Sequence, residues 1–200
     1  MPQIDYFFSV LSPWAYLAGN RLEEIAAKHG ATVDYNPLDI MTLLDRTGGI
    51  RPVARHPNRL AYRDQELVRW SALTGRPLKV LPSQKTAPNP APASYAILAA
   101  KQAGGGDLGG LVQSFLAANW AENLDIADEA LIREKLTLAG FDPDLATTGL
   151  FIGAMAYERV LDEAVQRGVF GVPFYIARDT DQRFWGQDRL DLLDAHLGAQ

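Results

Sequence analysis

The chain has 200 residues, a formal net charge of -5, 48% hydrophobic and 22% charged side chains, and no cysteine. This is the composition of a globular protein that can bury a sizeable core, and its acidic excess argues against binding to nucleic acid. Without cysteine there is no disulfide, thiolate metal site or protein-thiol chemistry, so any thiol that the protein uses must come from another molecule.

The N-terminal part of the chain predicts a β-α-β unit. Residues 4–11 are rich in aromatic and branched side chains, which favours a strand. Ser12 and Pro13 then suit a helix N-cap and a first helical position, and a helix is expected over residues 14–28. Alternation over residues 31–38 predicts a second strand.

The middle of the chain carries helical signals. Four prolines between residues 82 and 92 exclude a continuous helix there and predict a loop. On both sides of this loop, helices are expected over residues 41–45, 59–74, 94–102, 107–119, 129–139 and 143–167, the last of them broken near 147–149.

Strand signals return near the C-terminus. Residues 169–177 and 183–185 predict two strands, and residues 187–197 predict a final amphipathic helix. Neither end of the chain alone has enough strands for a stable sheet. We therefore expect one discontinuous α/β domain, residues 1–40 and 166–200, split by a large all-helical insertion over residues 41–165.

Two short motifs carry the candidate chemistry. Ser12-Pro13-Trp14-Ala15 lies where a strand leads into a helix, and the free N–H groups at a helix start favour an anion. Taken alone, the motif is also consistent with a simple N-cap. The second motif is Val172-Pro173, where a cis bond would expose the Val172 backbone to a ligand. An ordinary edge-strand proline is the alternative.

Together these motifs resemble the thioredoxin-like pattern of a helix start facing a cis-proline loop. The stretch from Phe7 to Tyr16 resembles the active-site entry of DsbA-like oxidoreductases, with Ser12 and Ala15 where that family has its two cysteines. The Ser-Pro entry, the helical insertion, Phe-Gly-Val-Pro and the later Phe-Trp-Gly-Gln-Asp-Arg at 184–189 resemble the kappa-class glutathione transferases and the 2-hydroxychromene-2-carboxylate isomerases.

The resemblance implies a glutathione site. By position, Ser12 would contact the glutathione sulfur, and Val172 before Pro173 would pair with the glutathione backbone. The turn that would hold the γ-glutamyl end consists of Trp185, Gly186, Gln187 and Asp188. Arg59 stands where the kappa class has a lysine that approaches the glutathione carboxylate.

Several of these roles have a structural alternative. Asp188 also suits an N-cap, Arg59 suits a solvated surface position, and Asn89, near a loop asparagine that touches substrate in relatives, also suits a turn. An aromatic substrate could lie against Trp14, Trp120 or Trp185, of which Trp14 is the best candidate, although tryptophans more often belong to the core. We expect Arg63, with the charged residues that follow it on the helix, to form surface ion pairs.

The leading functional hypothesis is a glutathione-dependent isomerase that acts on a small aromatic substrate, as in aromatic hydrocarbon catabolism. A kappa-type glutathione transferase or peroxidase and a non-catalytic DsbA-like peptide-binding module remain open. The histidines are widely spaced and indicate no metal site. No apolar run approaches the ~20 residues of a membrane span, and no secretory signal is evident. We therefore expect a cytoplasmic protein without membrane partners, and the family suggests a homodimer.

Overall fold

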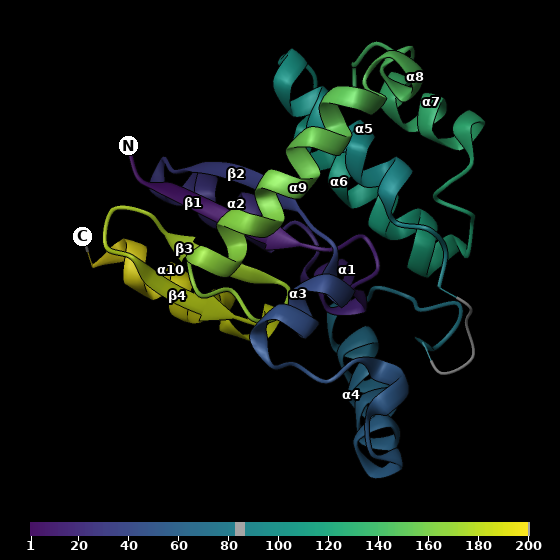
Figure 1. The fold of residues 1–200 in the computed structure, drawn as a ribbon. Helices are drawn as coiled ribbons and strands as arrows, with labels where there is room; N and C mark the ends of the chain where they lie inside the picture. Colours follow the sequence, from purple (N-terminus) through teal and green to yellow (C-terminus); the bar gives the residue numbers. More distant parts are fainter. Residues whose placement is uncertain (83–86, 200) are drawn as a thin grey trace.

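The two ends of the chain build one mixed sheet in the computed structural model, which describes residues 1–82 and 87–199. β1 (Gln3–Phe8) is parallel to β2 (Thr32–Pro37) on one side and antiparallel to β3 (Phe174–Ala177) on the other. β4 (Gln182–Trp185) is antiparallel to β3. The order is therefore β2-β1-β3-β4, with both termini at the same end of the sheet (Figure 1).

The other described elements are helical, and most of them lie in the chain between β2 and β3. The α-helices are α1 (Pro13–Ala18), α2 (Arg21–His29), α3 (Ile40–Thr47), α4 (Pro57–Thr74), α5 (Ala91–Ala103), α6 (Leu108–Ala117), α7 (Glu129–Leu138), α8 (Leu145–Thr148), α9 (Leu150–Gln166) and α10 (Leu190–Gly198). Short turns of other helical types are η1 (Pro52–Ala54), η3 (Ala118–Glu122) and η4 (Gln187–Arg189). This confirms the predicted α/β fold with a helical insertion.

Successive side chains along a strand point to opposite faces of the sheet, and both faces are covered by a hydrophobic core. On one face, Tyr6 and Phe8 of β1 share a core with Leu22 of α2 and Leu193 of α10. On the other face, Phe7 packs in a second core to which α3 and α9 contribute. Figure 1 shows α9 crossing the sheet, whereas α4, in which Leu67 is the buried residue, extends away from the body. None of the described helices is long and apolar enough to span a membrane.

The helix expected over residues 14–28 is in fact two helices, α1 and α2. The break falls at Gly19, which has a φ of 60°, and its carbonyl accepts a hydrogen bond from Gln113 Nε2 at 2.8 Å. This bond joins residues far apart in the sequence, so no local pattern indicates it. The expected break before α9 is confirmed by the separation of α8 from α9.

Two other expectations need comment. The strand expected over residues 169–177 is shorter, because ladder pairing to β1 and β4 begins only at Phe174. The predicted proline-rich loop is described only in part, since residues 83–86 lie outside the described chain. The domain boundaries at 40 and 166 stay a prediction, and α9 of the helical insertion packs directly against the sheet.

Candidate functional site

Ser12 is the N-cap of α1, in the connection that follows the central strand β1. Its Oγ accepts a hydrogen bond from the Ala15 N–H at 3.2 Å, its own N–H donates to Ser9 O at 2.8 Å, and the residue is only 6% exposed. Within the described chain, the Ser12 hydroxyl donates to no acceptor and no histidine or carboxylate is hydrogen-bonded to it. The hydroxyl can therefore donate to a ligand, but it has no base that would make it a nucleophile.

A buried asparagine from the helical insertion holds the loop that leads to Ser12. Asn119 Nδ2 donates a hydrogen bond to Val10 O at 2.9 Å, and Asn119 is 1% exposed. The neighbouring Trp14 is partly buried and packs against the larger core. The position of Ser12 thus depends on η3 as well as on β1.

The Val172-Pro173 bond is cis, as the sequence predicted. Because Phe7 is paired with Phe174 in antiparallel strands, this bond lies at the end of the sheet where β1 leads into Ser12. Pro173 O accepts from Gly186 N at 2.9 Å. In contrast, the Val172 N–H and C=O form no hydrogen bond with any described group, so both are available to an extended ligand.

The turn after β4 folds against this loop. The Trp185 side chain lies over Gly171, whose Cβ, if present, would be 2.6 Å from Trp185 Nε1. Gly186 has a φ of 105°, and Gln187 is 2% exposed. Gly171 and Gly186 therefore both need to be glycine, one for space and one for backbone conformation.

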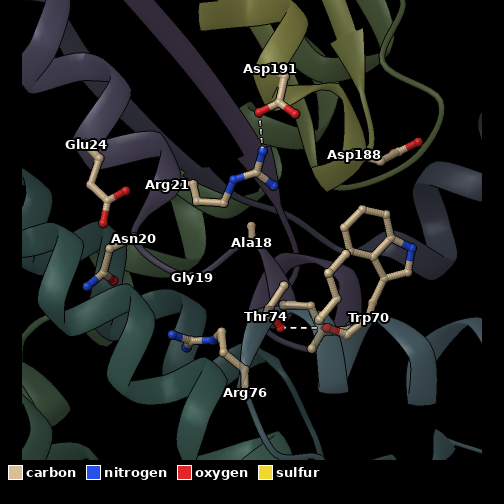
Figure 2. A pocket seen from close by; sticks show the side chains of 12 residues that line it. Ala18, Gly19, Asn20, Arg21, Glu24, Trp70, Thr74, Arg76, Asp188 and Asp191 are labelled. Carbon is tan, nitrogen blue, oxygen red and sulfur yellow. Dashed lines mark hydrogen bonds and ion pairs between the residues drawn. The ribbon is translucent and has the colours of Figure 1, made fainter.

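Asp188 is exposed and forms no helix cap within the described chain, so the alternative of a structural N-cap is wrong. Its carboxylate lies 3.3 Å from Arg189. It borders a cavity of about 520 Å³, with Trp70 of α4 beside it (Figure 2). Arg21 and Asp191, also at this cavity, form an ion pair of 2.6 Å.

A second cavity, of about 450 Å³, begins at Leu11, directly before Ser12. Its walls are mostly apolar and include Met41, Leu60 and Trp120. The size and the lining suit an aromatic small molecule. Arg63 is one of the few charged residues on its wall.

The remaining predicted site residues lie elsewhere. Arg59 is exposed and lines a third, outer cavity of about 430 Å³. Asn89 lies in the turn before α5, where its Oδ1 accepts from the Ala91 N–H at 3.1 Å, and it is not among the described residues that line the apolar cavity. Neither is Trp14. The substrate roles of Asn89 and Trp14 stay predictions, without support from this geometry.

Sequence reasoning found only part of the cavity wall that the insertion supplies, because it considered Trp120 as an aromatic wall and missed Asn119 and Arg63. Trp120 and Asn119 line the cavity through η3, and Arg63 lines it through α4. Besides the aromatic Trp120, the asparagine in an apolar helical stretch is a local signal, whereas Arg63 gives none. The expected surface pairing is correct for Arg69, which binds Glu66, and wrong for Arg63, which forms no ion pair within the described chain.

Comparisons with known proteins fit this architecture. The family model of the DSBA-like thioredoxin domain matches residues 3–198. The 2-hydroxychromene-2-carboxylate isomerase of Sphingobium xenophagum is 31% identical over 207 residues, covering 97% of each chain. That of Pseudomonas putida is 32% identical over 201 residues, covering 98% of this chain and 94% of the relative.

Solved structures of other proteins have the same fold. A 2-hydroxychromene-2-carboxylate isomerase structure is similar with a TM-score of 0.77 and 29% identity, covering 98% of this chain and 95% of the other. The cytosolic disulfide reductase DsbM of Pseudomonas aeruginosa, solved with GSH, has a TM-score of 0.72 and 20% identity, covering 99% and 98%. At that identity the likeness shows a shared fold alone.

Proposed function

The chain belongs to the DsbA-like thioredoxin domains and to the family of 2-hydroxychromene-2-carboxylate isomerases, and from this premise we propose that it is a glutathione-dependent isomerase of unsaturated aromatic 2-oxo acids. The observation that carries the proposal is Ser12, a buried N-cap without a base, in a chain without cysteine. The site is built like a thiol site and has no thiol of its own.

Three groups of this chain fit glutathione. The Ser12 hydroxyl has a proton to donate to a thiolate. The Val172 N–H and C=O, unpaired within the described chain, can bind the tripeptide backbone as an added strand would. Asp188, an exposed carboxylate near the start of α10, can accept the γ-glutamyl ammonium.

Bound glutathione would supply a thiolate that adds reversibly to the conjugated double bond of the substrate, permits rotation, and leaves unchanged. The task of Ser12 is to hold the sulfur in its ionised form by donating a hydrogen bond to it. α1 has only six residues and Ser12 already uses the Ala15 N–H. The hydroxyl, more than the helix dipole, therefore lowers the thiol pKa from its ordinary ~8.5.

The apolar cavity beside Leu11 performs the second task, which is to hold the aromatic ring next to the sulfur. Its wall combines Met41 and Leu60 with the indole of Trp120. Such a wall excludes water around the reacting atoms and leaves the ring free to turn, because it offers few directional contacts.

The test is to mix the purified protein with 2-hydroxychromene-2-carboxylate, with and without glutathione, and to follow the absorbance of the open benzylidenepyruvate. We expect rapid conversion only with glutathione, which mass spectrometry should recover unchanged. A stable conjugate would instead indicate a transferase. Glutathione-independent conversion, or no conversion by a folded protein, would refute the proposal.

A further inference from the structure

Arg63 stands out because it lies between two cavities. It lines the apolar cavity beside Leu11, and it also lines the outer cavity together with Arg55 and Arg59. The three arginines follow one another at intervals of four residues, and Arg59 and Arg63 are on the first half of α4. Arg63 is partly buried, and of these three arginines it alone is among the described residues that line the apolar cavity.

Among the described residues that line these two cavities, Asp64 is the one carboxylate. Arg51, which also lines the apolar cavity, is already paired with Asp45. Arg63, in contrast, forms no hydrogen bond or ion pair with any residue that the structure describes. A guanidinium group with five donors, partly buried and without such a partner, can bind a carboxylate.

The charges around Arg63 also favour the binding of an anion. Burial lowers the pKa of Arg63, the charge of Arg55 lowers it further, and the neighbouring Asp64 offsets only part of the effect. Burial and the charge of Arg59 likewise lower the pKa of Arg55. Because arginine stays protonated at neutral pH, the cluster repels itself, and an anion bound at Arg63 would relieve that repulsion.

We propose that Arg63 binds the carboxylate of the substrate and makes the apolar cavity selective for aromatic acids over uncharged aromatic compounds. The ring would lie against Leu60 and Trp120 while the acid group reaches the guanidinium. The proposal rests on the proposed function only for the identity of the acid, an unsaturated 2-oxo acid. The binding preference itself needs neither glutathione nor turnover.

The experiment compares calorimetric binding of trans-cinnamate with that of cinnamamide, which has the same ring and no charge. The wild-type protein should prefer the acid by about tenfold or more, the scale of one charge-assisted hydrogen bond. Arg63→Met should abolish this preference and leave cinnamamide binding unchanged. The matched control is Arg69→Met, on the same helix and paired with Glu66, which should behave as wild type.

Three results would overturn the proposal. One is equal binding of acid and amide by the wild-type protein. Another is an Arg63→Met variant, folded by circular dichroism, that loses both ligands equally, because the arginine stem would then only shape the wall. The third is a loss of glutathione affinity in Arg63→Met with cinnamate binding intact. None of these depends on isomerase turnover, so the two proposals fail separately.

Discussion

Replacing Asp188 by asparagine should weaken glutathione binding about tenfold. Losing a charged partner typically costs about 1.5–3 kcal/mol. Here the Asp188 side chain is 44% exposed and Arg189 lies 3.3 Å away, so solvent and a neighbouring cation already screen the carboxylate. The low end of the range, about 1.5 kcal/mol, corresponds to roughly tenfold in Kd. Calorimetric titration of the wild-type and variant proteins measures it.

A matched control separates a specific contact from general charge. Asp191 borders the same cavity, but its carboxylate is engaged by Arg21 at 2.6 Å. Asp191→Asn should therefore leave the glutathione affinity nearly unchanged. A glutathione analogue without the γ-glutamyl ammonium should bind wild type and Asp188→Asn equally. If Asp191→Asn weakens binding as much as Asp188→Asn, or if Asp188→Asn has no effect, the contact assigned to Asp188 is refuted.

Two further predictions concern the fold. Gly153→Ala should destabilise the protein by about 1–3 kcal/mol in chemical denaturation, because the new methyl group would lie 2.5 Å from Tyr95 O. The control variant is Gly198→Ala, whose methyl group would lie 3.3 Å from the His29 ring and should leave the stability nearly unchanged. Burial raises the pKa of Glu23, so the wild-type free energy of unfolding should fall as the pH rises above the ordinary glutamate value of about 4.3, and Glu23→Gln should lack this fall. A pH series that runs parallel for wild type and Glu23→Gln would contradict the second prediction, and unchanged stability of Gly153→Ala would contradict the first.

The general architecture could be predicted because strand and helix signals are local. The strands at the two ends follow from runs such as residues 4–11, and the helical insertion follows from its apolar spacing. The break between α1 and α2 could not be predicted, since the bond that fixes Gly19 comes from Gln113 on α6. Tertiary contacts of this kind leave no trace in a short window of sequence.

Part of the candidate site could likewise be predicted from the sequence and part could not. Ser12 and the cis Val172-Pro173 bond belong to short motifs, which the sequence displays directly. The wall of the apolar cavity is different, because Trp120 of η3 and Arg63 of α4 come together with Leu11 only in the folded chain. Spacing alone assigned Arg63 to a surface ion pair, and only the three-dimensional arrangement brings it to the cavity.

The most direct test of the account is the pH titration of the thiolate absorbance of bound glutathione in wild type and in Ser12→Ala. The account predicts that the variant keeps its fold and much of its affinity, while the pKa of the bound thiol rises. Turnover should then fall at neutral pH, and the deficit should shrink as the pH increases, because solvent deprotonates the thiol without help. An unshifted thiol titration with a rate deficit that is constant across pH would contradict the thiolate-stabilising role of Ser12.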